Sequence, residues 1–318
     1  MCSSILRYVR TPIQNQKKFA ALAIDSLKVT FFFIHLKPRS NILSNKKIRM
    51  KIKKLFFALL ILFLTTSFKT IHNDIHEVEL VARTREFYQI KTYIFKTEQQ
   101  VQATEKYLKE AFLPGLKKLG IKNIGVFKPK PNATDTIKKI IIVIPFSSMK
   151  QFLAIEDKLA KDKTYLTAGA DYLNANYKQP PYLRIESIIL RAFADHPFLS
   201  SPILNSLRAN RVYELRSYES ATEAIYKNKV DMFNAGGEIK LFDRLAFNAV
   251  FYGEVISGAK MPNLMYMTTF ADQKSRDSHW KAFVDSPEWK GLLAMEKYKN
   301  NISHIDITFL YPTDYSDY

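Results

Sequence analysis

Apolar and polar residues alternate in short stretches of this chain from about residue 86 onward, which is the pattern of half-buried β-strands. The clearest stretch, residues 212–218, reads Val-Tyr-Glu-Leu-Arg-Ser-Tyr. Both of its faces are rich in apolar or aromatic side chains, so we expect both to be covered in the folded protein. One face carries Val212, Glu214, Arg216 and Tyr218, and the other carries Tyr213, Leu215 and Ser217.

Longer stretches lie between the strands of the first part of the body and predict helices. Gly120 follows the first of them, at the place where a residue in the left-handed conformation commonly ends a helix. The elements expected in this part are strand 86–95, helix 98–119, strand 121–128, strand 138–145, helix 147–159 and strand 183–193.

The second part of the body predicts the same order of elements. Residues 235–237, Ala-Gly-Gly, form a break after its first helix that lets the chain turn back. The elements expected here are strand 212–218, helix 221–234, strand 247–256, strand 264–270, a helical stretch 271–298 in two pieces and strand 304–310.

The two parts also match each other in sequence at an almost constant separation of 124 or 125 residues. Three matches at nearly one separation indicate an internal repeat. We therefore assign two related halves, 83–195 and 207–312. The matching segments are 88–93 with 213–218, 141–146 with 265–270, and 162–165 with 286–289.

The order β-α-β-β-α-β in each half is that of a ferredoxin-like unit, an antiparallel sheet with both helices on one face. Such a sheet leaves its other face bare, and a bare apolar face must be covered. The predicted fold class is therefore α+β, with two ferredoxin-like repeats packed as an intrachain α/β barrel of the dimeric type. Single-unit proteins reach the same barrel only by dimerising.

The chain of 318 residues has a formal net charge of +18, which raises the question of a nucleic-acid partner. Residues 1–49 contribute +9 and residues 50–70 contribute +4, leaving +5 for residues 71–318. The positive charge thus belongs mainly to the leader, and no nucleic-acid-binding motif accompanies it. We expect no nucleic-acid partner.

The leader has the layout of a secretory signal peptide at 50–70, where Met50 and three lysines precede the apolar run 55–64. Residues 1–49 show no sustained periodicity, and we interpret them as a doubtful N-terminal extension, with a basic targeting arm as the alternative. We expect an exported protein, periplasmic or secreted. An uncleaved leader that anchors the protein in a membrane, or a buried helix, remains an alternative. The single cysteine, Cys2, lies in the doubtful extension and leaves the body without a thiol.

The second half resembles the NIPSNAP family along nearly its whole length. The segments that carry the resemblance are the Tyr-Glu-Leu-Arg-Ser-Tyr strand at 213–218, Phe-Tyr-Gly-Glu at 251–254, Pro-Asn-Leu at 262–264 and the helical stretch 280–289. The first half looks like a diverged NIPSNAP-like copy. It has Gln89 and Lys91 where the second half has Glu214 and Arg216.

The resemblance implies membership of the dimeric α/β-barrel superfamily. Some members of that superfamily are small oxygenases, haem enzymes or isomerases, and others have no known reaction. For NIPSNAP-like proteins the resemblance implies binding or scaffolding more than a defined catalysis.

Candidate ligand-binding residues lie on one face of the 212–218 strand. Glu214, Arg216 and Tyr218 project from it in steps of two residues, and if that face points into the barrel they would line a cavity and orient a polar ligand. The alternative is a Glu214–Arg216 ion pair that is satisfied within the sheet. Second candidates on neighbouring strands, which are also ordinary core residues, are Tyr252, Glu254 and Tyr266.

No metal ligand or cofactor is predicted. His72 and His76 have the spacing of two ligands on a helix, but Asn73 and Asp74 favour a loop there. Glycine-rich phosphate loops and zinc-like clusters do not occur in the sequence. The remaining histidines of the body are expected in a linker, on a helix surface and at the start of the last strand, at His196, His279 and His304.

Aromatic residues at Trp280, Phe283 and Trp289 are spaced to mark a helix face, and we interpret them as core residues that seat this helix on its sheet. The residues after 310 are expected to form a surface strap. Neither prediction assigns a function to these residues.

The function expected from these patterns is that of an exported binding module for a small or lipid-like ligand, or for a protein partner. An α/β-barrel enzyme is the alternative, either a cofactor-free oxygenase or isomerase that uses Arg216 and Tyr218, or a haem protein. A structural interaction module with a filled barrel is the third possibility. The sequence assigns no oligomeric state and no reaction.

Overall fold

The computed structural model describes residues 85–131 and 137–318. Its compact unit Leu80–Tyr318 contains both predicted halves. The predicted extension and signal peptide lie outside the described residues, as do Cys2, His72 and His76. Within the described part of the chain, no helix has the length and apolar character needed to cross a bilayer.

The first helix of the first half begins where the sequence supplies a start signal. Thr97 accepts a hydrogen bond from the backbone of Gln100, whose side chain accepts one from the backbone of Thr97, and this capping box starts the first helix. The elements are β1 (Phe87–Phe95), α3 (Glu98–Tyr107), the π-helical turn η2 (Leu108–Phe112), α4 (Leu113–Lys118), β2 (Gly125–Pro129), β3 (Lys138–Phe146), α5 (Met149–Leu153), α6 (Ile155–Leu159), α7 (Lys163–Ala168), α8 (Ala170–Leu173) and β4 (Arg184–Ala192).

The second half repeats the order. Gly237 has a φ of 90°, which is the left-handed conformation expected of the chain break, and it leads into a further helix. The elements are the 3-10 turn η3 (Arg208–Asn210), β5 (Val212–Glu219), α9 (Glu223–Phe233), α10 (Glu238–Arg244), β6 (Ala249–Ser257), β7 (Asn263–Phe270), α11 (Gln273–Asp285), α12 (Pro287–Ala294), the 3-10 turn η4 (Glu296–Tyr298) and β8 (His304–Pro312).

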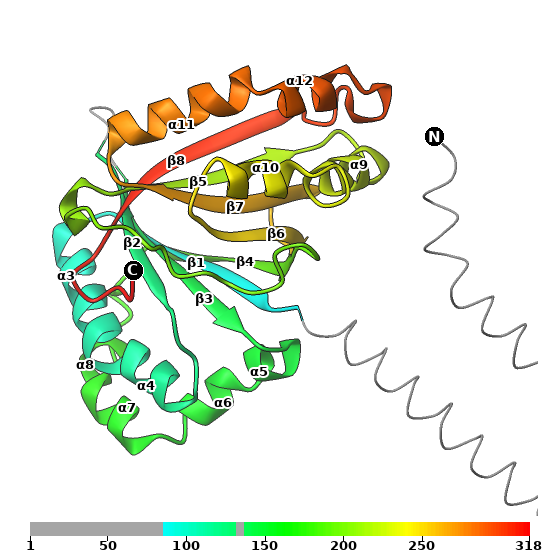
Figure 1. Ribbon diagram of the computed structural model, residues 1–318. Coiled ribbons are helices and arrows are strands. Elements are labelled where there is room, and N and C mark those ends of the chain that lie inside the picture. Colours follow the sequence, from blue (N-terminus) through cyan, green and yellow to red (C-terminus); the bar gives the residue numbers. More distant parts are fainter. Residues whose placement is uncertain (1–84, 132–136) are drawn as a thin grey trace, which may run out of the picture. The chain divides into compact units, whose positions relative to one another are not determined.

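All eight strands of the described residues form one closed antiparallel barrel, in the order β1-β3-β2-β8-β5-β7-β6-β4. Each half contributes a four-stranded ferredoxin-like sheet, and the two sheets join where β2 pairs with β8 and β4 pairs with β6. Figure 1 shows the helices α9 to α12 on one side of the barrel and α3 to α8 on the other. The predicted fold, two repeats closed into one intrachain barrel, is confirmed.

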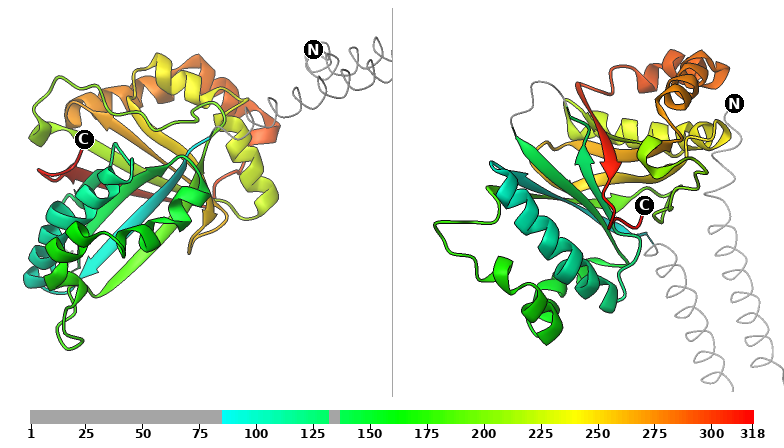
Figure 2. Two further views of the ribbon diagram at one scale, coloured as in Figure 1. Left: turned by 90° about the horizontal axis from the view of Figure 1, so that it is seen from below. Right: turned by 90° about the vertical axis from the view of Figure 1, so that its left-hand side faces the viewer.

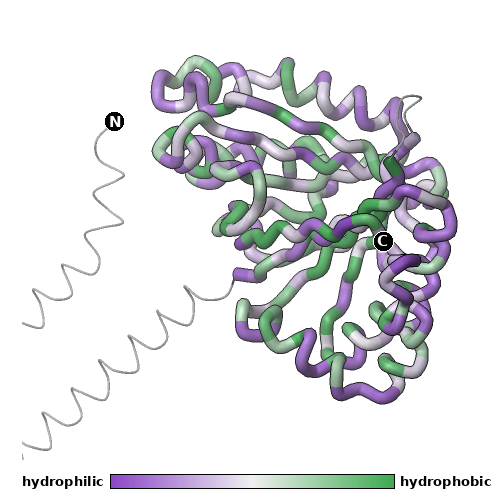
Figure 3. The backbone as a smooth tube through the Cα atoms, turned by 180° about the vertical axis from the view of Figure 1, so that it is seen from behind, coloured by the Kyte–Doolittle hydropathy of each residue, from purple (hydrophilic) through white to green (hydrophobic). Residues whose placement is uncertain are grey.

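The two faces of each sheet are covered by different parts of the chain. The outer faces pack against their own helices, as the two further views show (Figure 2). The inner faces close on each other around an apolar lumen, and the hydrophobic residues concentrate along the strands (Figure 3). Lumen side chains include Tyr88, Ile90, Tyr213, Leu215 and Met267.

Several boundaries differ from the predicted ones. The long first helix is divided by η2, and β2 begins at Gly125 instead of residue 121, because Asn123 takes a left-handed φ of 55°. Helices α7, α8 and α10 were not anticipated, since each is a short piece whose periodicity is too brief to detect.

The end of the chain is not the surface strap that we expected. The ring of Tyr318 is 5% exposed and packs against Phe127 and Tyr213 at one end of the lumen. Its hydroxyl donates a hydrogen bond to the carbonyl of Asn123. Burial of an aromatic ring among other rings explains why the tail folds back onto the barrel.

Candidate functional site

The face of β5 that carries Glu214, Arg216 and Tyr218 points toward the helices, not into the barrel. The lumen is lined instead by the alternate residues Tyr213 and Leu215. The predicted cavity inside the barrel is therefore not where these three side chains lie. They occupy the layer between β5 and the helices α9, α10, α11 and α12.

Glu214 is fully buried and receives hydrogen bonds on both carboxylate oxygens. Arg276 donates to both oxygens at 2.8 Å, and the indole Nε1 of Trp280 donates to one at 2.9 Å. Arg216 donates to the other through Nε at 2.8 Å. Although burial alone would raise it, the pKa of Glu214 is lowered by the hydrogen bonds from Arg276 and the charge of Arg216. The ion pair expected from the sequence is present, with a second arginine on it.

Arg216 connects this carboxylate to a pair of tyrosines. Its Nη1 donates to the hydroxyl of Tyr218 at 2.9 Å, and that hydroxyl lies 2.7 Å from the hydroxyl of Tyr266. The guanidinium carbon lies over the ring of Trp280, 3.7 Å from its centre, which adds a cation–π contact. Burial raises the pKa of both tyrosines, so their hydroxyls are protonated at neutral pH.

A second buried ion pair, which the sequence analysis did not identify, lies beside these groups. Lys229 of α9 donates to Glu238 of α10 at 2.8 Å, and both side chains are 2% exposed. The ammonium also lies 4.6 Å from the ring centre of Phe233 and 5.6 Å from that of Trp289. Burial raises the pKa of Glu238. The signal in the sequence was a lysine on the apolar face of a helix, three residues after Tyr226 and three before Met232.

These groups form one end of a cavity of about 340 Å³ between the sheet and the helices. Apolar and aromatic side chains from α11, α12 and the segment around the start of β8 form the rest of its wall. The lining residues are Arg216, Tyr218, Lys229, Glu238, Arg276, Trp280, Phe283, Val284, Trp289, Ile302 and Ile305. Trp280 and Trp289 thus pack against the core, as expected, and also border this cavity.

The equivalent place in the first half is occupied by aromatic rings. Lys91 stands where Arg216 stands in the second half, 5.4 Å from the ring centre of Tyr93 and 5.0 Å from that of Phe112. Tyr107 packs on Phe112 and also stacks on Tyr172, with 3.8 Å between the ring centres of the two tyrosines. Burial lowers the pKa of Lys91. The two halves therefore share a backbone but place different chemistry between sheet and helices.

The remaining predicted site residues lie in two different places. Tyr252 is fully buried and stacks on Tyr266 with 5.6 Å between ring centres, so it lies behind the cavity wall. Glu254 does not join the cluster. Its carboxylate instead accepts hydrogen bonds from Arg85 at 3.3 Å and from Arg191 of the adjacent strand β4 at 3.1 Å.

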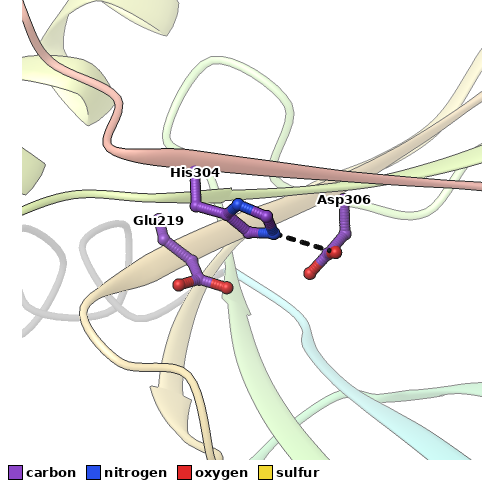
Figure 4. Close-up of side chains that lie close together, drawn as sticks. All are labelled: Glu219, His304 and Asp306. Atoms are coloured by element: carbon purple, nitrogen blue, oxygen red, sulfur yellow. Dashed lines mark hydrogen bonds and ion pairs between the residues drawn. The ribbon is translucent and has the colours of Figure 1, made fainter.

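One cluster of possible metal ligands occurs in the described residues, at the ends of β5 and β8 (Figure 4). It consists of Glu219, His304 and Asp306, with His304 Nε2 lying 3.1 Å from Asp306. Lys260 forms an ion pair with Asp306 and lies 3.7 Å from Glu219, and its hydrogen bond lowers the pKa of Asp306. Because the lysine already supplies a positive charge to both carboxylates, we assign no metal to this cluster.

Comparison with known proteins identifies the domain that holds the cavity. Residues 213–317 match the NIPSNAP family model. No curated protein sequence matches the chain. Among solved structures, a monooxygenase-like protein from Lactobacillus acidophilus NCFM is similar with a TM-score of 0.47 at 12% identity, over 72% of this chain and 94% of that one.

Solved NIPSNAP proteins align with about one third of this chain. A NIPSNAP family protein from Agrobacterium tumefaciens matches with a TM-score of 0.30 at 17% identity, over 34% of this chain and 98% of that one. A NIPSNAP-like domain protein from Burkholderia xenovorans matches with a TM-score of 0.31 at 14% identity, over 34% of this chain and 90% of that one. The second half of this chain, at residues 213–317, is a NIPSNAP domain.

Proposed function

We propose that this protein binds a small amphipathic ligand in the cavity between β5 and the helices of its NIPSNAP domain. An acidic group of the ligand would contact Arg216 and Tyr218. Its apolar part would lie against Trp289 and Phe283. This refines the binding module expected from the sequence.

The observation that carries this proposal is the hydrogen-bonding capacity left on Arg216. A guanidinium has five N–H groups, and the contacts to Glu214 and Tyr218 use three of them. Two remain on a side chain that is 8% exposed and borders the cavity. A buried guanidinium with unused N–H groups favours a ligand that accepts hydrogen bonds, because leaving them without partners costs free energy.

The charges around the cavity also favour an acidic ligand. Three buried or partly buried cations, Arg216, Lys229 and Arg276, face the two buried carboxylates Glu214 and Glu238. The third carboxylate nearby, Asp277, pairs with Arg276 but is 59% exposed, so water screens it. One excess positive charge inside the cavity matches a ligand with one negative charge.

The protonation of the lining groups supports binding more than proton abstraction. The hydroxyls of Tyr218 and Tyr266 are protonated, so they donate hydrogen bonds and do not act as bases. Glu214 is ionised, but all its contacts are to Arg216, Arg276 and Trp280. These side chains are therefore suited to bind and orient an acidic group of a ligand.

Tryptophan fluorescence tests the proposal directly, because the chain has two tryptophans and both border the cavity. Octanoate is a suitable probe, with one carboxylate and an apolar chain, and octanol is its uncharged counterpart. We expect octanoate to change the emission of the full-length protein saturably, and octanol to bind more weakly.

The matched variants are Arg216→Met and Lys91→Met, which remove the equivalent cation from each half. We expect Arg216→Met to weaken octanoate binding by about 10-fold or more, the value of a charge-assisted hydrogen bond. Lys91→Met should leave it unchanged. Equal octanoate affinity in the wild type and Arg216→Met, or no saturable change in the wild type, would refute the proposal.

We also propose that the protein is exported by the leader 50–70. The support is the sequence pattern alone, a positive segment followed by the apolar run 55–64. Mass spectrometry of the protein isolated from its native cells tests this proposal. A mature N-terminus soon after residue 64 would support export with cleavage of the leader, and an N-terminus at or before Met50 would contradict that cleavage.

A further inference from the structure

A second cavity, of about 280 Å³, lies inside the barrel at the end where β5 finishes and β7 and β8 begin. Its lining comes from strands on opposite sides of the barrel. With eight strands in the order given above, β3 is opposite β7 and β4 is opposite β8. Lys139 of β3 and Asn263 of β7 both line it, as do Ile188 of β4 and Thr308 of β8. The cavity therefore extends across the lumen and is not a groove between neighbouring strands.

This lumen cavity is separate from the site proposed above. Leu215 and Ser217 of β5 line it, while Arg216 and Tyr218 of the same strand line the other one. Alternate residues of a strand point to opposite faces, so the sheet itself separates the two cavities.

Asn263 is the unusual residue in the lumen cavity. It is 2% exposed, and its amide nitrogen donates to the hydroxyl of Ser217 at 2.9 Å. Its carbonyl oxygen Oδ1 is buried without a hydrogen-bond partner among the described residues. Such an acceptor costs free energy unless something donates to it, so it indicates a hydrogen-bond donor that occupies the cavity.

The repeat shows that this asparagine is not required by the fold. Lys139 occupies the equivalent position of the first half, 124 residues earlier, and lines the same cavity from the other side. Lys139 is exposed, so its ammonium reaches solvent. The two related strands therefore contribute a solvated cation and a buried amide.

The surroundings of Asn263 favour an uncharged partner. Leu215, Met265 and Val255 form the apolar inner part of the cavity. At the rim, Lys260 pairs with Asp306 and lies 3.7 Å from Glu219, while Lys139 is exposed to solvent. The rim therefore offers an anion no buried cation, and moving a charge onto the apolar inner wall would be unfavourable.

We propose that the lumen cavity is a second ligand site for a small, uncharged amphipathic molecule. An O–H or N–H group of the ligand donates to Asn263 Oδ1, and its apolar part lies on Leu215 and Met265. Primary alcohols and amides with a short aliphatic chain have this chemistry.

Ligand-observed NMR with the full-length protein tests this site, using hexanamide as the probe and hexanoate as its charged counterpart. We expect hexanamide to bind saturably and more tightly than hexanoate. Asn263→Leu, which removes the acceptor at similar side-chain size, should weaken hexanamide binding by about 10-fold. The matched control Gln89→Leu removes an amide from the outer face of strand β1 and should leave binding unchanged.

A second variant keeps the test decisive if Asn263→Leu does not fold. Val255→Phe adds a ring to the inner wall of the cavity without removing a polar group, and it should also abolish hexanamide binding. Circular dichroism establishes which variants are folded. The proposal would be overturned by unchanged hexanamide affinity in whichever of Asn263→Leu and Val255→Phe is folded. Tighter binding of hexanoate, or no saturable binding to the wild type, would also overturn it.

Discussion

The guanidinium carbon of Arg216 lies 3.7 Å from the ring centre of Trp280, and the indole nitrogen of the same tryptophan donates to Glu214. Trp280 therefore contacts both members of the ion pair that the strand β5 presents to the helices. One residue of α11 holds the charged pair in place by a ring face and an N–H group.

Trp280→Phe should lower the free energy of unfolding by about 1–3 kcal/mol, because it keeps an aromatic ring but removes a hydrogen bond to a buried carboxylate. Urea unfolding followed by circular dichroism measures the change. Trp289→Phe is the control, since Trp289 packs on Phe283 and its indole makes no hydrogen bond within the described residues. Similar losses in both variants would show that ring size, and not the contact to Glu214, is what matters.

The buried pair Lys229 and Glu238 leads to a prediction about how the two residues depend on each other. Lys229→Met leaves the Glu238 carboxylate buried without its partner, and we expect a loss of about 3–5 kcal/mol in the free energy of unfolding. The double variant Lys229→Met with Glu238→Leu removes both charges and should be markedly more stable than Lys229→Met alone.

A double-mutant cycle in urea measures this dependence. If the losses of the two single variants simply add in the double variant, the ion pair contributes nothing to stability and the prediction is wrong. Arg244→Met supplies the surface comparison, because its pair with Glu288 is half exposed, and we expect a change of less than about 1 kcal/mol.

The barrel could be predicted from the sequence because its signals are long and repeated. The alternation in residues 212–218, its copy at 88–93 and the order of elements in each half together specify two ferredoxin-like sheets. Both faces of these strands are apolar, and closure into one barrel is the arrangement that covers them all.

The site could be predicted only in part, because alternation shows which residues share a face but not which face is inside. Glu214, Arg216, Tyr218 and Tyr266 do lie together, yet on the helical side of the sheet. Lys229, Glu238 and Arg276 come from three helices, and their meeting depends on helix packing that no local pattern specifies.

Tyr318 packs at the end of the barrel opposite to the lumen cavity, and its removal tests whether it closes that end. Tyr318→Ala removes a buried ring from contact with Phe127 and Tyr213, and we expect the free energy of unfolding to fall by about 3 kcal/mol. Thermal and urea unfolding measure the effect. Tyr177→Ala is the matched control, because Tyr177 is 85% exposed and its loss should change stability by less than about 0.5 kcal/mol. A small effect for Tyr318→Ala would mean that the tail does not hold its place on the barrel in solution.

The lowered pKa of Glu214 predicts how stability depends on pH. A carboxyl group whose pKa in the folded state lies below its ordinary value of 4.5 contributes stability above that value, and the contribution is lost as the pH falls through the folded-state pKa. The pKa of Glu238 is shifted in the opposite direction, so the pH dependence of the wild type alone would combine the effects of the two groups.

We therefore expect the difference in unfolding free energy between the wild type and Glu214→Gln to be largest above pH 4.5. The difference should shrink as the pH is lowered further, because the protonated wild-type side chain then resembles the amide. Urea unfolding at a series of pH values from neutral to acid gives this difference. A difference that stays constant across the series would show that the hydrogen bonds from Arg276 and Trp280 do not favour the ionised form of Glu214.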